Sequence, residues 1–199
     1  MAGHGALAAT LSSIVAVLED GFVAAIPPGP NVRRPVARMA GTVDFDRANT
    51  PGAVIQNPTV SVYCYRLSVD RETRPGWSAV ASRDGVPRLP LRMHLLVTAW
   101  DEFVENELRW LGLAAHILES TSVLTGPLLD PAGGWAPGDM VQVVPDDMAL
   151  ESMSEAFQAL TADFRLYLLY QARVIVIDGR PAGGGEPVAT VASRTGTGS

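Results

Sequence analysis

The residues best suited to chemistry are concentrated between residues 91 and 120. His94 and His116 could act as metal ligands or general bases, and Asp101, Glu102 and Glu105 supply carboxylates. Neither histidine has a second His or Cys at the spacing of a zinc site. The carboxylates come where a helix is expected to begin, and the free N–H groups there favour negative charge. We therefore interpret this stretch as structural frame and expect no metal or cofactor.

Absent residue types and motifs exclude several enzyme classes. All fifteen basic residues are arginine, so a P-loop lysine, a Schiff-base lysine and a lysine general base are excluded. The patterns G-x-G-x-x-G, H-E-x-x-H and G-x-S-x-G do not occur. The single cysteine, Cys64, rules out an intrachain disulfide, and its apolar neighbours indicate packing rather than a nucleophile. A dispersed Ser/His/Asp site stays open, because such sites are recognised by geometry and not by sequence order.

Length and charge narrow the class of protein. A chain of 199 residues is long enough for one domain with a sizeable core. The net charge of −6 argues against broad nucleic-acid binding, which needs a basic face. Residues 1–18 carry no charged side chain, but they lack a basic n-region, so an amphipathic first helix is favoured over a signal peptide. No segment is judged apolar enough for a membrane span.

Hydrophobic periodicity predicts helices at roughly 3–19, 101–119 and 148–160. The first helix is expected to end at Glu19-Asp20-Gly21. For the second helix, the predicted core stripe steps by three and four residues and is widened by three aromatic or aliphatic side chains. The stripe comprises Val104, Leu108, Leu111, Ala115 and Leu118, with Phe103, Trp110 and Ile117 beside it.

Period-two patterns and β-branched runs predict strands at 41–46, 58–69, 91–100, 140–145 and 163–178. In 91–100 one face is wholly apolar and the other is mixed. The last strand would span roughly 50 Å, so a bend, a bulge or an overhang is expected there. Residues 70–88 are predicted to be a hairpin-like excursion, and 119–139 a loop. The predicted fold is α/β (α+β), with a single mixed β-sheet flanked by helices.

Two segments are candidate interaction surfaces. Arg33, Arg34 and Arg38 occur in a Pro-rich connection and could form a docking patch for an acidic partner, although such a run can also be a solvated loop. Residues 179–199 are Gly-rich and are expected to form a flexible tail. Within this tail, one short segment could add as a strand to another chain. It consists of Pro187, Val188, Ala189, Thr190 and Val191.

The order of elements resembles a known family. The segments that carry the resemblance are PTVSVYCYRL at 58–67, LRMHLLVTAW at 91–100 and FRLYLLYQARVIVID at 164–178. In this order they resemble the Pvc-type cap, or tail-terminator, family of phage-tail-like contractile injection systems. None is a chemical motif, so the specificity lies in order and spacing. Phe157 stands where the family often has Trp. The resemblance predicts a cap domain over residues 1–178, followed by the tail at 179–199.

The resemblance implies a structural role without catalytic residues. The expected protein forms a six-fold ring that ends the inner tube and anchors the last sheath layer. Its implied partners are further copies of itself, the inner tube protein and the sheath protein. Assembly is expected in the cytoplasm, in a particle that is then released or retained. Two alternatives are another ring or adaptor component of the same particle, and a small soluble enzyme using dispersed groups such as His94, His116 and Asp101.

Overall fold

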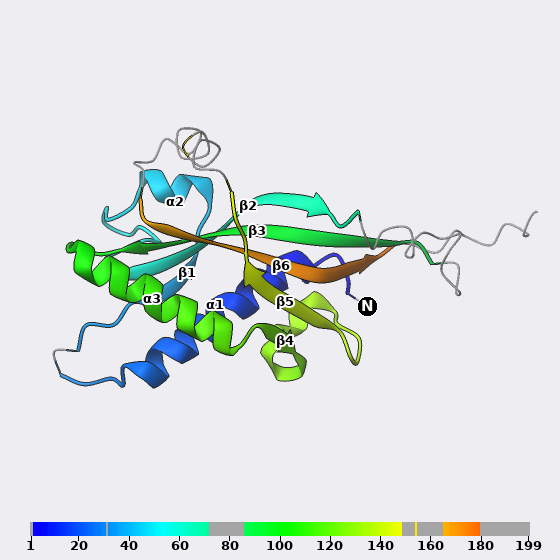
Figure 1. Ribbon diagram of the computed structural model, residues 1–199, viewed down its shortest axis with the longest axis horizontal. Coiled ribbons are helices and arrows are strands. Elements are labelled where there is room, and N and C mark those ends of the chain that lie inside the picture. The colour runs from blue at the N-terminus through cyan, green and yellow to red at the C-terminus, as the bar shows by residue number, and fades with distance from the viewer. Residues whose placement is uncertain (1, 31, 72–85, 149–153, 155–164, 180–199) are drawn as a thin grey trace, which may run out of the picture.

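The computed structural model describes residues 2–30, 32–71, 86–148, 154 and 165–179 (Figure 1). The helices are α1 (Ala6–Ala25), α2 (Thr42–Asp46) and α3 (Val104–Ser120), with short 3₁₀ turns at η2 (Gly126–Leu128) and η3 (Pro131–Gly133). The strands are β1 (Val36–Met39), β2 (Thr59–Val69), β3 (Arg88–Trp100), β4 (Val123–Thr125), β5 (Met140–Pro145) and β6 (Tyr167–Asp178).

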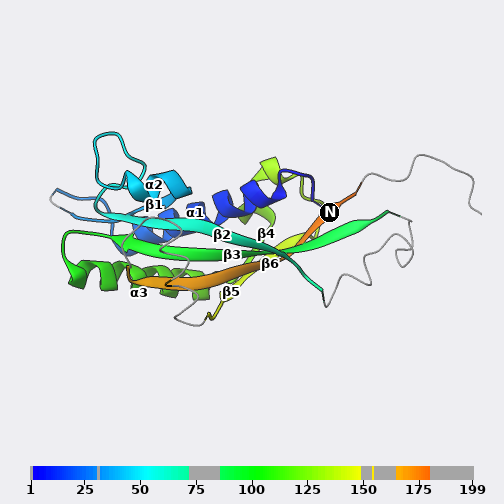
Figure 2. The same ribbon diagram turned by 90° about the horizontal axis from the view of Figure 1, so that it is seen from above.

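The strands form one six-stranded sheet in the order β1-β2-β3-β6-β5-β4. β1 is parallel to β2, and the other neighbours are antiparallel, so the predicted single mixed sheet is confirmed. Figure 1 shows α1 and α3 on one side of the sheet and α2 on the other. In the view from above, the distal ends of β2, β3 and β6 extend past the helices (Figure 2). This extension is called the overhang below.

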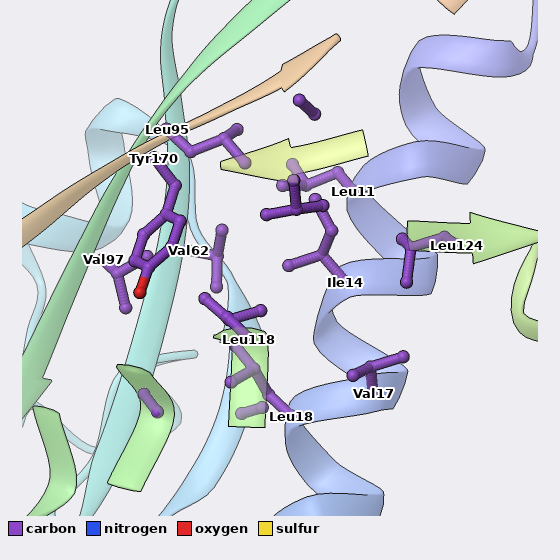
Figure 3. Close-up of a cluster of buried hydrophobic side chains, with 14 of the residues drawn as sticks. Leu11, Ile14, Val17, Leu18, Val62, Leu95, Val97, Leu118, Leu124 and Tyr170 are labelled. Atoms are coloured by element: carbon purple, nitrogen blue, oxygen red, sulfur yellow. The ribbon is translucent and has the colours of Figure 1, made fainter. Parts of the chain in front are cut away.

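The main core lies between the sheet and the two long helices. Figure 3 shows Leu11, Ile14 and Leu18 of α1 directed at Val62 of β2 and Leu95 of β3. These side chains are almost fully buried, and each buried aliphatic side chain contributes about 1.5–3 kcal/mol. The three helical positions recur every three or four residues, which places them on one face of α1. The predicted apolar face of β3 is therefore the face that the helices cover.

A second, smaller core covers part of the opposite sheet face. Phe45 of α2 and Ile55 pack over Leu96, Trp100 and Leu169 of the sheet. The ring centroids of Phe45 and Trp100 are 5.7 Å apart. This cover ends near Leu96, so the mixed face of β3 is apolar beneath α2 and polar further toward the overhang.

Both neighbours of β3 carry a bulge. Between Cys64 and Arg66, β2 has one residue more than β3. Between Ala172 and Ile175, β6 also has one residue more than β3. An extra residue exchanges the faces of every residue that follows it, so Ile175 is buried although the apolar alternation begins with Tyr170 and Ala172. The bulge expected in the last strand is thereby confirmed.

The strand predicted at residues 41–46 is wrong, because this segment forms α2. Asp44 accepts a hydrogen bond from the Gly41 N–H at 2.7 Å, which satisfies an exposed donor at the helix start. The parallel edge strand β1 lies instead in the preceding segment, which was interpreted as a connection. β4, η2 and η3 likewise occupy the segment predicted to be loop at 119–139.

The predicted end of the first helix is also wrong, since α1 continues through Gly21 to Ala25. A Cβ atom at Gly21 would lie 2.6 Å from Ile117 Cδ1, so this glycine lets α1 pass close to α3. Glu19, rather than closing the helix, accepts a hydrogen bond from Ala37 of β1 at 2.8 Å. By length and composition α1 could cross a membrane, contrary to the sequence-based judgement, but half of its most apolar window is buried in this fold.

Candidate functional site

A polar pocket lies on the mixed sheet face beside the overhang. It has a volume of about 810 Å³. Its walls come from β2, β3, β6 and the segment after β5, and they include Arg66, Ser68, Arg71, Arg92, His94, Asp146 and Gln171. Strand register explains the grouping, because Arg66 pairs with His94, and His94 pairs with Gln171. We call this cavity the polar pocket.

Hydrogen bonds connect Ser68, His94 and Asp146 within the polar pocket. Ser68 Oγ is 2.9 Å from His94 Nε2, and His94 Nδ1 is 2.7 Å from Asp146 Oδ2. Asp146 Oδ1 accepts a further hydrogen bond from Gln171 Nε2 at 3.0 Å. The first three residues thus follow the order of a Ser-His-Asp triad. Together with Gln171, these residues connect β2, β3, β6 and the end of β5.

The surroundings of Ser68 favour a structural role for this chain of hydrogen bonds. A hydrolytic serine needs N–H donors beside it to stabilise an oxyanion. Ser68 instead lies within β2 opposite Arg92, where its backbone is part of the β2–β3 ladder. Beside His94, burial and the Asp146 charge raise the pKa of Tyr65 to about 12, so this phenol stays neutral near pH 7.

Charge in the polar pocket is unevenly compensated. Arg92 Nη2 lies 2.8 Å from Asp70 Oδ1 in an ion pair, and His94 is hydrogen-bonded to Asp146. Among the described residues, Arg66 and Arg71 form no such ion pair. The pocket therefore has an excess of positive charge in a protein whose net charge is −6.

Asp101 acts as a structural hub at the start of α3. Its buried Oδ1 accepts hydrogen bonds from the Glu102 and Phe103 N–H groups and from Asn106 Nδ2, at 2.8, 3.2 and 3.1 Å. Oδ2 accepts one from Trp110 Nε1 at 3.2 Å. Burial acts to raise the pKa of Asp101, but these bonds and the Arg33 charge outweigh it and hold the pKa below the ordinary value of 3.8.

The three predicted interface arginines differ in their surroundings. Arg33 Nη2 lies 3.2 Å from Asp101 Oδ1, and Arg34 Nη1 donates to the Ile26 carbonyl at 3.2 Å. Arg38 is exposed on the edge strand β1, where Nη1 donates to the Ala37 carbonyl at 2.9 Å. Arg33 is therefore tied to the start of α3 by an ion pair with a buried carboxylate. The predicted interface segment Pro187–Val191 and most of the predicted helix at 148–160 lie outside the described residues.

His94 and His116 do not form a common site. His116 is exposed on α3, on the helical side of the sheet, whereas His94 lies on the opposite face. His116 borders a largely apolar groove of about 570 Å³ between the C-terminal halves of α1 and α3. Within the part of the chain that the structure describes, no three His, Cys, Asp or Glu residues form a metal site.

The predicted core stripe of α3 is wrong over its first two turns. Phe103, Val104 and Leu108 are each more than half exposed, whereas Leu111 and Leu118 are buried as expected. The buried face of α3 is centred on Trp110, Ala114 and Ile117, and the exposed side chains of Val104 and Leu108 lie to one side of it. We call Phe103, Val104 and Leu108 the apolar α3 patch. Grouped apolar side chains of this kind are typical of interaction surfaces.

Sequence reasoning found His94 but missed Ser68 and Asp146 as its partners. The three residues lie on separate elements, and only the register of β2 against β3 and the turn after β5 bring them together. The one signal available was the polar residue at every second position of the mixed face, Arg92 and His94.

Comparison with known proteins assigns the fold to a family. No relative was found among curated proteins. Among solved structures, the sheath/tube terminator of the extracellular contractile injection system PVC, in its extended state, is 18% identical with a TM-score of 0.51; the likeness covers 95% of this chain and 64% of that one. The anti-feeding prophage tube-terminating cap is 18% identical with a TM-score of 0.48, over 90% of this chain and 59% of that chain. This chain thus spans less than two thirds of either protein. Residues 10–190 match the Pvc16 N-terminal domain, and the chain belongs to that family.

Proposed function

We propose that this protein is the terminal cap of a contractile injection system, where it ends the inner tube and anchors the last sheath layer. The observation that carries this proposal is the family match over residues 10–190. The likeness in fold to the sheath/tube terminator supports it. Family membership alone does not separate a cap from another ring component of the same particle, so position in the particle is the deciding measurement.

The cap is proposed to act as a six-membered ring without catalytic activity. Ring closure needs two different surfaces on each subunit, which meet head to tail. The apolar α3 patch supplies one surface that loses unfavourable water contact when a neighbouring subunit covers it. Arg38 and the segment Pro187–Val191 are proposed as contacts with tube, sheath or neighbouring subunits. Assembly in the cytoplasm is part of the same proposal.

Electron cryo-microscopy of assembled particles tests the cap assignment. The protein is co-expressed with the tube and sheath proteins of its own particle, and density for this chain is expected in six copies at the terminal layer opposite the baseplate. Its presence at the baseplate end would favour the adaptor alternative. A number of copies other than six would contradict the ring.

Two substitutions test the proposed surfaces. Leu108→Asp should reduce incorporation into particles and leave the melting temperature within a few degrees, because Leu108 is 56% exposed. Val43→Asp is the matched control, since Val43 is 57% exposed on α2 at the other side of the sheet. Arg38→Glu should also reduce incorporation, more so at low salt, where exposed charges act over a longer range. Equal incorporation of Leu108→Asp, Val43→Asp and the unmodified protein would remove the apolar α3 patch from the proposal.

A further inference from the structure

We propose that the distal edge of β2, together with the polar pocket, binds an extended segment of a partner protein in which acidic and apolar side chains alternate. This inference rests on the proposed function only in its choice of partner, a component of the same particle. It assigns a binding site to the uncovered end of the sheet, which neither the sequence resemblance nor the fold comparison identifies.

The first observation is an open strand edge. β1 pairs with β2 only from Thr59 to Val62, so no described strand lies beside residues 63–69 on that side. Asp70 N donates to the Pro90 carbonyl at 3.0 Å, which fixes the phase of the β2–β3 ladder. In an antiparallel ladder, backbone groups alternate in direction. The N–H and C=O groups of Leu67 and Val69 therefore face the open side, where an added strand can pair with them.

The second observation is the charge on one face of this edge. Arg66 and Ser68 direct their side chains to the polar pocket, and Arg71 lines it as well. Arg66 and Arg71 have no carboxylate partner among the described residues, whereas nearby Arg92 is paired with Asp70. Arginine is suited to carboxylates, because its planar guanidinium group offers several donors to the two oxygens. Acidic side chains on one face of an added strand would reach both of these arginines.

The third observation concerns the other face of the same edge. Leu67 and Val69 alternate with Arg66 and Ser68 and therefore lie on the opposite face. They are 52% and 37% exposed, because the helices do not extend over the overhang. Apolar side chains of an added strand would lie beside them. Cross-strand apolar neighbours stabilise a sheet, so this end of β2 favours acidic residues on one face of the incoming strand and apolar residues on the other.

The hydrogen-bonded chain of Ser68, His94 and Asp146 gives the pocket a fixed floor. His94 is held on both ring nitrogens, at 2.9 and 2.7 Å, and Asp146 is also held by Gln171. These contacts leave the Asp146 carboxylate occupied inside the protein, so it does not compete for Arg66 and Arg71. Among the residues that the structure describes, Arg66 and Arg71 thereby keep their positive charge for a ligand.

Fluorescence anisotropy with three labelled seven-residue peptides and the full-length protein tests the proposal. The first peptide alternates Glu and Val, the second alternates Lys and Val, and the third alternates Glu and Pro. Only the Glu-Val peptide should bind, because lysines are repelled and prolines cannot add to a strand. Binding should weaken about tenfold for each of Arg66→Gln and Arg71→Gln, which corresponds to the loss of one charge-assisted contact. Arg47→Gln is the matched control, since Arg47 is exposed after α2, away from the pocket, and it should bind like the unmodified protein.

Each other outcome overturns a stated part of the proposal. Equal binding of the Lys-Val peptide would show that the arginines do not select the ligand. Equal binding of the Glu-Pro peptide, or complete competition by millimolar inorganic phosphate, would show a site for small anions and no strand addition. A peptide of residues 185–192 that binds more tightly than the Glu-Val peptide would identify the tail of a second copy as the occupant. Absence of any binding, with normal incorporation into particles, would remove the binding site and leave the cap assignment standing. Peptide binding by a protein that is absent from the terminal layer would contradict the cap assignment and leave the binding site standing.

Discussion

Arg33 Nη2 lies 3.2 Å from Oδ1 of Asp101, whose side chain is completely buried while that of Arg33 is 40% exposed. This contact joins the connection after α1 to the start of α3. Four other hydrogen bonds converge on the same carboxylate, including the one from Trp110. The acidic residues before α3 thus have a structural task, as the sequence predicted, although one carboxylate performs most of it.

Replacing Asp101 by Ala should lower the free energy of unfolding by about 2–4 kcal/mol, because buried donors, including Trp110 Nε1, lose a charged acceptor. Arg33→Ala should cost about 1 kcal/mol or less, since the exposed arginine is already partly solvated. Urea denaturation measures both. A larger loss for Arg33→Ala than for Asp101→Ala would contradict the account of the hub.

Stability should also depend on pH through Asp101. Its pKa is lower in the folded than in the unfolded protein, so the folded state favours the ionised form. The resulting stabilisation is fully present above the unfolded pKa and is lost as the pH falls through the folded pKa. The difference in unfolding free energy between the unmodified protein and Asp101→Asn should therefore be constant from pH 7 to 5 and shrink below about pH 4. A constant difference down to pH 3 would argue against this linkage.

Two glycines inside helices should respond in opposite directions to alanine. Gly21→Ala should destabilise the protein by about 1–3 kcal/mol, because its Cβ would overlap Ile117 across the α1–α3 contact. Gly112→Ala should stabilise it by about 0.5–1 kcal/mol, because nothing lies within 4 Å of that Cβ and alanine is the better helix former. Thermal melting of both variants gives the comparison, and a stabilising Gly21→Ala would show that the two helices can separate at no cost.

Cys64 should react slowly with thiol reagents in the folded protein. Burial raises the pKa of this thiol, and hydrogen bonds with the backbone of Arg66 and His94 only partly oppose the effect. At pH 8 alkylation by iodoacetamide should be at least about tenfold slower than in the urea-unfolded protein, since the thiolate is the reactive form. Equal rates would indicate that Cys64 is more accessible and more acidic than its packing implies.

Ser68 should not react with fluorophosphonate probes, despite its hydrogen bond to His94. The serine lies in a regular part of a strand, and its backbone is committed to the sheet ladder rather than to oxyanion binding. Mass spectrometry of the treated protein should show no adduct at Ser68. An adduct that disappears in His94→Ala would revive the enzyme alternative.

Hydrophobic periodicity predicted the long strands and helices. It failed for a short segment and for side chains whose burial depends on tertiary packing. β2, β3 and α3 are long enough for their period to be recognised, and each occurs close to where the sequence placed it. Residues 41–46 are too few for a period to be recognised reliably. In α2 Phe45 is buried and Val43 is exposed, and the Gly41–Asp44 hydrogen bond satisfies a donor at the helix start. The exposure of Val104 and Leu108 was not predicted, because apolar side chains occupy more of the circumference of α3 than the fold covers, and tertiary packing selects the face of Trp110 and Ala114.

The polar pocket could be predicted from the sequence only in part. Arg66, Ser68, Arg92 and His94 belong to strands that the sequence identified, but their grouping depends on strand register, which no local pattern specifies. Asp146 joins them from the end of β5, far along the chain. The predicted arginine patch illustrates the converse: three residues close in sequence were given separate partners by the fold.

The side chains of β3 alternate regularly between the two sheet faces, whereas its neighbours β2 and β6 each contain a bulge. Along β3, odd-numbered residues face the helices from Leu91 to Ala99, whereas in β2 the helix-facing residues change from even (Val60, Val62) to odd (Leu67). β6 changes parity in the same sense, from Ala172 to Ile175. If the same sequence paired with β3 without this bulge, Arg66 would point toward the helices and Leu67 toward the polar pocket. The bulge, and not only the composition of β2, therefore decides which side chains the overhang presents to a partner.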